Sequence, residues 1–116
     1  MLTDLELGWL VGLLEGEGSF YCQRMKQSVI RRTVSIATTD LDVLLKYKLI
    51  VEKGTNHTHN IRIDKKKVHK DQYRITIVNQ HAIRLMKLIL THMGERRKLK
   101  IEQCLIGYLP EKRKAN

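Results

Sequence analysis

Two carboxylates near the start of the chain, Glu15 and Glu17, lie in a glycine-rich segment. Gly8, Gly12 and Gly16 recur every four residues, so they share one face of a helix. A glycine stripe lets another backbone approach closely, and a small chain can satisfy such a stripe by pairing with a second copy about a two-fold axis. We therefore predict a homodimer. The expected interface residues are Gly8, Leu10, Val11, Gly12 and Glu15.

Pairing of two copies would bring two helix ends together, each with its own Glu17. Two carboxylates at one place repel each other unless a cation lies between them, and Mg²⁺ (or Mn²⁺) is a hard cation that prefers oxygen ligands. Beside a phosphate, such an ion activates water and stabilises the leaving oxygen. Glu17 is therefore the candidate catalytic and metal-binding residue, with an ordinary surface carboxylate as the alternative. We expect Glu15 to support the helix end rather than to bind metal.

The charge of the chain predicts a polyanionic partner. Its 116 residues include 22 Lys and Arg against 12 Asp and Glu, which gives a net charge of +10. The first 23 residues contain four acids and no Lys or Arg, so they carry −4 and the rest of the chain carries +14. A body this basic is typical of nucleic-acid-binding domains.

Composition excludes several other classes of protein. A hydrophobic content of 42% is enough for a core, which argues against disorder. No apolar run approaches the roughly 18 residues of a membrane span. Only two cysteines, Cys22 and Cys104, are present, which excludes a disulfide scaffold and predicts an intracellular location.

The hydrophobic pattern predicts one α+β domain over residues 1–109, with elements in the order αββαββα, a further helix, and a basic tail at 110–116. Thr3 and Glu6 form a capping box that opens the first helix, and Gly16 and Gly18 end it. The other expected elements are strands 19–25 and 31–38, a helix from the Thr39-Asp40 cap to Gly54, strands 60–64 and 72–77, a helix from the Asn79 cap to Gly94, and a helix over 101–108 stopped by Pro110.

Alternation along the four strands predicts a sheet with two different faces. Helices must cover the apolar face, which carries Phe20, Cys22, Val34, Ile36, Ile61, Ile63, Tyr73, Ile75 and Ile77. The other face is rich in groups that read base edges, although an ordinary solvated face is the alternative. The candidate DNA contacts are Tyr21, Gln23, Arg31, Thr33, Ser35, Asn60, Arg62, Lys65, Lys66, Lys67, Gln72, Arg74 and Thr76. We expect Arg62 and Arg74 to read bases and the loop lysines to contact phosphates.

Residues 9–20 read Trp-Leu-Val-Gly-Leu-Leu-Glu-Gly-Glu-Gly-Ser-Phe, which resembles the signature of the LAGLIDADG homing endonucleases. The identical letters are Leu10, Gly12, Leu13 and Gly18, while Glu15 and Glu17 replace the two aspartates of the motif. The stretch 93–98 is similar to that of small phage-type members. The order of elements resembles the family over nearly the whole chain.

The resemblance implies a four-stranded antiparallel saddle sheet packed under helices. It also implies a homodimeric, Mg²⁺-dependent endonuclease of mobile introns or phages that cuts double-stranded DNA at a near-palindromic site. Glu17 would bind metal in each copy, and the carbonyl of Gly16 would be a further ligand. Some relatives are maturases or regulators that bind DNA or RNA without cutting, and this remains the alternative function.

The resemblance also implies supporting residues around the metal. Family members place a lysine near the start of a C-terminal helix, which points here to 96–98 and leaves the register open between Arg97 and Lys98. They often carry a glutamine at the end of the second strand, where it orients water. Thr38 occupies that position, and this departure puts water positioning in doubt.

Two further sets of residues carry little chemistry. His57 and His59 would share a strand face, but further ligands at zinc-site spacing are missing from the sequence. Neither Cys22 nor Cys104 has a histidine or acid at the spacing of a catalytic thiol. We therefore expect neither a zinc site nor a nucleophilic cysteine.

Overall fold

The computed structural model describes residues 1–66 and 70–107, and its elements follow the predicted αββαββαα order. The first half contains α1 (Asp4–Glu17), β1 (Gly18–Arg24), the short 3₁₀ helix η1 (Lys26–Ser28), β2 (Ile30–Thr38) and α2 (Leu41–Thr55). The second half contains β3 (Arg62–Asp64), β4 (Gln72–Val78), α3 (Asn79–Ile89), the 3₁₀ turn η2 (Leu90–His92) and α4 (Glu95–Ile106). None of the helices in these residues is both long and apolar enough to cross a membrane.

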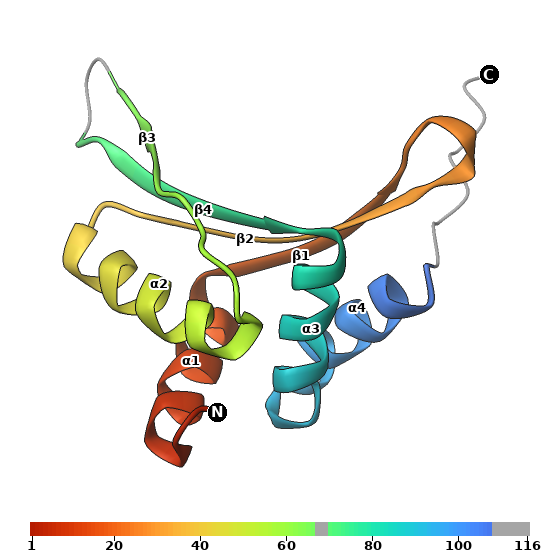
Figure 1. Cartoon of the computed structure of the whole chain (residues 1–116), viewed down its shortest axis with the longest axis horizontal. Coiled ribbons are helices and arrows are strands. Elements are labelled where there is room, and N and C mark those ends of the chain that lie inside the picture. The colour runs from red at the N-terminus through yellow and green to blue at the C-terminus, as the bar shows by residue number, and fades with distance from the viewer. Residues whose placement is uncertain (67–69, 108–116) are drawn as a thin grey trace.

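The four strands form one antiparallel sheet in the order β1-β2-β4-β3. Figure 1 shows the sheet as a curved saddle, with α1, α2, α3 and α4 on one face and the other face open. The predicted α+β class and saddle sheet are confirmed. The pairing of β2 with β4 joins the two ββα halves of the chain into a single layer.

Strand register explains why the two faces differ. Phe20 lies opposite Val34, and Val34 lies opposite Ile77, so the three side chains are neighbours on the helix-covered face. Ile36 and Ile75 form the adjacent pair, and all five residues are at most 4% exposed. Burial of such apolar surface contributes about 25 cal/mol per Å². The helices therefore stay on this face of the sheet.

Each helix contributes buried side chains to the same core. The main contributions are Leu10 and Leu14 from α1, Leu44, Tyr47 and Val51 from α2, Leu85, Met86 and Ile89 from α3, and Ile101 and Cys104 from α4. Ile63 was expected on the apolar face but is 51% exposed, because β3 is a short edge strand. Asn60 and Ile61 lie before β3 rather than in it, so this strand is shorter than predicted.

Helix α2 differs from the sequence prediction in where it ends and in how it is capped. α2 continues through Gly54 to Thr55, and Asn56 makes the left-handed turn with φ 53°. Gly54 serves packing instead, because a Cβ there would lie 3.1 Å from Leu88 Cδ2. Asp40 precedes α2 as expected, but its side chain makes no capping hydrogen bond.

The C-terminal helices also differ from the prediction. Asn79 is the first residue of α3 rather than its cap, and it has a left-handed φ of 57°. α3 ends at Ile89, after which η2 and the buried Met93 turn the chain, and Gly94 becomes the N-cap of α4. α4 begins at Glu95, earlier than predicted, and ends at Ile106, where Gly107 follows as the C-cap with a φ of 74°. Tyr108, Pro110, the tail 110–116 and Lys67 lie outside the described residues.

Candidate active site

The N-terminal end of α1 is firmly anchored. The Thr3 hydroxyl accepts a hydrogen bond from Glu6 N, and the Glu6 carboxylate accepts one from Thr3 N, which confirms the predicted capping box. Lys53 of α2 donates to both Glu6 oxygens at 2.8 and 2.9 Å. The Lys53 ammonium and the Thr3 amide together lower the pKa of Glu6 to about 2. These contacts fix the direction of α1 beneath the sheet.

The C-terminal end of α1 presents Glu17 where the helix meets the edge strand. β1 begins at Gly18, immediately after Glu17, and Gly18 N donates to Leu14 O. A Cβ at Gly18 would lie 2.7 Å from that carbonyl oxygen, so only glycine permits this turn. The Glu17 side chain is exposed at the junction.

Glu15 and Glu17 have different surroundings. Glu15 Oε2 lies 3.4 Å from Gly94 N, so Glu15 links the end of α1 to the start of α4. No residue in 1–66 or 70–107 forms a hydrogen bond or ion pair with the Glu17 carboxylate. The last turn of α1 also contains no basic residue, so both carboxylates lie at the negative end of the helix dipole. Glu17 is thus an exposed carboxylate available to an external cation.

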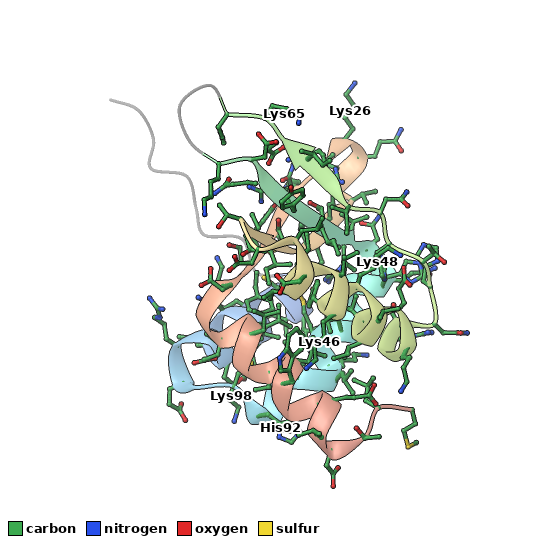
Figure 2. All side chains as sticks on the ribbon, turned by 90° about the vertical axis from the view of Figure 1, so that its left-hand side faces the viewer. Lys26, Lys46, Lys48, Lys65, His92 and Lys98 are labelled. Carbon is green, nitrogen blue, oxygen red and sulfur yellow. The ribbon has the colours of Figure 1, made fainter. Side chains whose placement is uncertain are left out.

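Arg97 is the cation that the fold brings to this junction. Its guanidinium donates to the carbonyl of Gly18, the residue after Glu17, and lies 6.0 Å from the centre of the Phe20 ring. Its Nε is buried and has no hydrogen-bond partner among the described residues. One residue further on, Lys98 projects about 100° around the helix. Figure 2 shows Lys98 in the helical layer, so Arg97 is the better placed of the two candidates.

Thr38 lies at the same end of the sheet as Glu17. Gly18 pairs with Ile36, and Thr38 follows two residues later on the same strand. The Thr38 hydroxyl accepts a hydrogen bond from Asp40 N at 3.1 Å, which shapes the turn into α2. The Asp40 amide therefore holds the Thr38 side chain against the neighbouring backbone. A glutamine side chain at this position is longer and would extend further from the strand.

The glycine stripe of α1 faces away from the core. A Cβ built on Gly8, Gly12 or Gly16 would meet no other atom within 4 Å. Leu10, by contrast, is 0% exposed in the core of its own chain, so its expected place in an interface between copies is wrong. Leu5 is 85% exposed beside the stripe and was missed, although its spacing of three residues from Gly8 was visible in the sequence.

The expected DNA-contacting residues mostly face the open side of the sheet. Tyr21, Gln23, Asn60, Arg62, Lys65, Lys66 and Thr76 are exposed, and Arg31, Gln72 and Arg74 are half-buried. Thr33 and Ser35 face the same side but are only 1% and 4% exposed, which contradicts their expected availability. They lie on a central strand, between side chains of β1 and β4, and Arg74 donates to Ser35 Oγ at 2.9 Å.

An acidic residue that the sequence analysis did not assign organises the two arginines of this face. Asp64 accepts from Arg62 Nε at 3.0 Å and from Arg74 Nε at 3.3 Å. These arginines, Arg74 first, lower the pKa of Asp64. The pairing of Arg62 with Arg74 across β3 and β4 brings the three together. The position of Asp64, two residues after Arg62 on one strand face, was the signal in the sequence.

A histidine cluster lies away from this junction, between the end of α2 and the start of α3. The His57 and His81 rings stack at 3.9 Å, and His59 Nε2 lies 2.8 Å from Thr55 Oγ1. Burial lowers the pKa of both His59 and His81. Within residues 1–66 and 70–107, no three His, Cys, Asp or Glu side chains are grouped to hold a metal ion. One copy offers Glu17 and helix-end carbonyls, which are oxygen donors suited to Mg²⁺ but only part of a ligand set.

The chain matches one protein-family model, that of the LAGLIDADG-like domain, over residues 4–88. No significant match is found among curated proteins. The solved structures that resemble it include the homing endonuclease I-CvuI in complex with the I-CreI target in 2 mM Mg, with the DNA not cleaved. This likeness has a TM-score of 0.67 and 14% identity, and it covers 89% of this chain and 65% of I-CvuI.

Two further structures give a similar result. I-CvuI in complex with its own target in 2 mM Ca matches with a TM-score of 0.67 and 14% identity, over 88% of this chain and 64% of that one. A mesophilic variant of the homing endonuclease I-DmoI matches with a TM-score of 0.50 and 15% identity, over 88% and 60%. The chain therefore spans less than two thirds of the length of these proteins.

Proposed function

The chain belongs to the LAGLIDADG-like domain family, and from this premise we propose that it is a homodimeric endonuclease that cuts double-stranded DNA at a specific, near-palindromic site. The homing-endonuclease fold provides the frame, and the reaction is hydrolysis of one phosphodiester bond in each strand. A divalent cation, Mg²⁺ or Mn²⁺, assists it. We place the protein inside the cell, with residues 1–109 as its single domain and 110–116 as a basic tail.

The exposed Glu17 carboxylate carries this proposal. It lies on the Gly18 turn without a partner in the described residues, at the negative end of α1. A protein does not gain stability from an unpaired carboxylate at that place, because the negative end of the helix dipole repels its charge. In the proposed enzyme, Glu17 and the carbonyl of Gly16 would hold the cation, which activates water and stabilises the leaving oxygen when bound.

Other residues would position the phosphate and the water. Arg97 is held against Gly18 O beside Glu17, so its charge can stabilise the negative phosphate in the transition state. Lys98 is the second candidate for this role, one residue further along α4. Thr38 is the candidate for orienting water, although its hydroxyl is engaged with Asp40 N.

DNA would lie across the open face of the sheet. The exposed polar and basic residues named above line this face and extend to the hairpin tips, where Figure 2 shows Lys26 and Lys65. Arg62 and Arg74 would read bases, since Asp64 holds both in a fixed arrangement. Lys65, Lys66 and Lys67 would contact phosphates, which position the protein without reading sequence.

The second copy would pack on the glycine stripe. Gly8 and Gly12 leave space for a backbone, and the half-buried Val11 and exposed Glu15 flank them. Such a contact places the two Glu17 residues together about the two-fold axis, which completes a cation site from two half sites.

A cleavage assay on a randomised pool of duplex DNA tests the proposal. We expect the wild-type protein in Mg²⁺ to cut a near-palindromic sequence, and we expect no cutting in Ca²⁺ or by Glu17→Gln. Equal cutting by wild type and Glu17→Gln would refute the role of Glu17.

A binding protein on the same fold is the second candidate. Thr38 favours this second candidate for two reasons: its hydroxyl already accepts a hydrogen bond from Asp40 N, and its side chain lacks the length to reach a water molecule. Selective binding of one duplex by the wild type in Mg²⁺, without cleavage, would identify a maturase or regulator. The restoring variant Thr38→Gln would then be tested for cleavage.

A further inference from the structure

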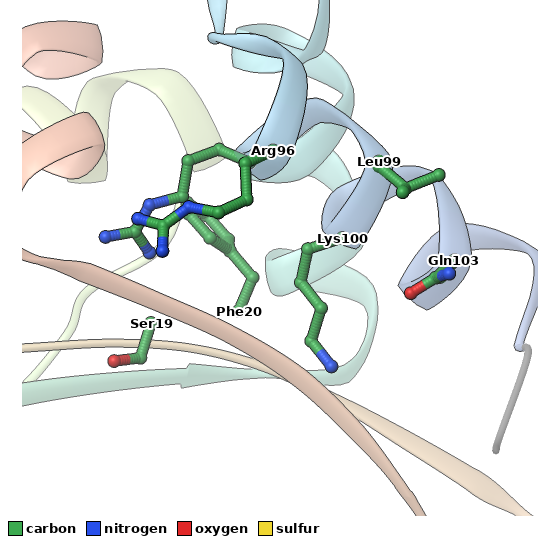
Figure 3. A pocket seen from close by; sticks show the side chains of 7 residues that line it. Ser19, Phe20, Arg96, Leu99, Lys100 and Gln103 are labelled. Carbon is green, nitrogen blue, oxygen red and sulfur yellow. The ribbon is translucent and has the colours of Figure 1, made fainter.

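A pocket of about 430 Å³ lies beside the proposed active site, between the edge strand β1 and α4. Figure 3 shows residues that line it, among them Arg96 and Lys100 from α4 and Phe20 from β1, and Arg97 of α4 lines it as well. None of the seven lining residues is acidic. Because α4 begins at Glu95, most of this pocket falls outside residues 4–88, the segment that matches the family.

The pocket attracts anions, because its lining contains three positively charged side chains and no acidic one. Arg96 and Lys100 are four residues apart on one side of α4, where like charges destabilise a helix unless an anion lies between them. Both side chains are exposed, and neither makes a hydrogen bond or ion pair with a described residue. Figure 3 shows the Lys100 ammonium reaching from α4 toward the sheet.

Arg97 adds a preorganised donor at the inner end of the pocket. Its guanidinium is fixed by Gly18 O and lies over Phe20, while its Nε is buried and unpaired within the described residues. A buried donor without a partner costs free energy that an acceptor would recover. Because Gly18 follows Glu17 directly, this hydrogen bond also holds the Arg97 guanidinium next to the Glu17 junction.

The walls of the pocket identify the class of anion. Phe20 and the exposed Leu99 supply apolar surface beside the three cations. A nucleic-acid backbone has the same alternation, since each charged phosphate is joined to a sugar with apolar carbons. Ser19 lines the pocket and lies two residues after Glu17, or about 7 Å along an extended chain, so a phosphate bound here would lie close to the Glu17 junction.

We propose that this pocket binds the backbone phosphate next to the scissile one, with Arg96 and Lys100 as its contacts, beside the Arg97 guanidinium that we assign to the scissile phosphate. The inference rests on the proposed function, because it assumes that duplex DNA reaches the end of α1. It adds a positioning site that holds the strand while Glu17 faces the scissile phosphate.

The salt dependence of DNA binding tests this site without knowledge of the target sequence. Phosphate contacts release counterions, so log Kobs decreases as log salt rises. The magnitude of this negative slope becomes smaller by about 0.9 for each phosphate contact that is lost. We would compare wild type, the double variant Arg96→Gln/Lys100→Gln and the control Lys87→Gln on one duplex of random sequence. Lys87 is exposed on α3 and does not line the pocket.

For each protomer bound to DNA, we expect the magnitude of the salt slope to be smaller by at least about 0.9 in the double variant than in the wild type. Lys87→Gln should keep the wild-type slope. A double variant with the wild-type slope would overturn the pocket. Equal losses in the double variant and the control would also overturn it, because the charge would then act at long range. Failure of the wild type to bind duplex DNA at all would instead refute the proposed function. Both variants replace exposed side chains, and circular dichroism checks that they fold.

Discussion

The two ends of α1 obey opposite rules. At the N-terminal end, Thr3 and Glu6 satisfy the free backbone groups, and Lys53 neutralises the Glu6 charge. At the C-terminal end, Glu15 and Glu17 add negative charge to a negative helix end, and the last turn contains no basic residue. One end has the composition of a stable helix, whereas the other has the composition of a site that awaits a cation.

This difference separates the residues that make the fold from those that we assign to function. The Glu6 carboxylate accepts three hydrogen bonds from two residues, Thr3 and Lys53, whereas Glu17 has no partner among the described residues. A local rule that is broken at one end of a helix, while it is kept at the other, is what we expect where a residue is kept for function. Substitutions at each end therefore test the contrast.

Removal of the Glu17 charge should have the largest effect. Glu17→Gln should reduce DNA cleavage by about 100- to 1000-fold or more, because the cation loses a charged ligand. DNA affinity should stay the same or rise, since a negative charge near phosphates disappears. The free energy of unfolding should rise by about 0.3–1 kcal/mol, because the helix dipole is no longer opposed.

Three measurements check this prediction: single-turnover cleavage, a binding titration and chemical denaturation. Glu102→Gln on α4 is the matched control, since it removes an exposed carboxylate elsewhere. A Glu17→Gln protein with lower stability and normal cleavage would reverse the comparison between the two ends of α1.

Filling the glycine stripe should have the next largest effect. Gly12→Leu should impose overpacking of about 1–3 kcal/mol in each copy, or about 2–6 kcal/mol per dimer, which corresponds to a rise of roughly 30-fold or more in the dimer dissociation constant. The protomer itself should become more stable by somewhat less than about 0.8–1.0 kcal/mol, the Gly-to-Ala difference, because leucine favours helix and a Cβ there meets no neighbour. Sedimentation equilibrium measures the first effect and denaturation below the dissociation constant measures the second.

Lys87→Leu adds the same side chain at an exposed position of α3 and serves as the control. If Gly12→Leu and wild type dimerise equally well, the stripe is not the contact between copies. The composite cation site would then lose its basis.

At the anchored end, Thr3→Ala should lower the free energy of unfolding by about 1 kcal/mol, because Glu6 N loses its acceptor. Cleavage by the folded protein should not change. Thr39→Ala, at an exposed threonine, should stay within about 0.5 kcal/mol of the wild type. Urea denaturation of the three proteins gives the comparison, and equal stabilities would show that the cap contributes nothing.

Local sequence patterns predicted much of this molecule. The capping box of Thr3 and Glu6 is a contact between residues three apart, and alternation along a strand fixes which face Val34 and Ile36 occupy. The family resemblance likewise rests on consecutive letters. These features depend on neighbours in the chain, so they can be read before the fold is known.

Tertiary neighbours determined what the sequence did not reveal. α1 is apolar around most of its circumference, so periodicity could not separate the buried Leu10 from the outward glycine stripe. The burial of Ser35 follows from Arg74, which lies 39 residues away in the chain. The choice of Arg97 over Lys98 depends on the Gly18 carbonyl, which lies 79 residues away in the chain.

The smallest expected effect depends on pH and isolates the charge of Glu6. Lys53 and Thr3 lower the pKa of Glu6 from 4.5 to about 2 in the folded chain, so this charge stabilises the fold above pH 4.5. The stabilisation is lost as the pH falls from 4.5 to about 2, because the carboxylate then takes up a proton. Glu6→Gln keeps a capping side chain but lacks the charge, so it should be less stable than wild type at neutral pH and approach it near pH 2.

Lys53→Met provides the matched test of this prediction, since it removes the partner and leaves Glu6 in place. Denaturation of both single variants and the double variant, at neutral and acidic pH, gives the coupling between the two residues. We expect coupling at neutral pH that disappears toward pH 2. Coupling that persists at pH 2 would mean that packing of the two side chains, rather than charge, anchors this end of α1, and the contrast with Glu17 would no longer be electrostatic.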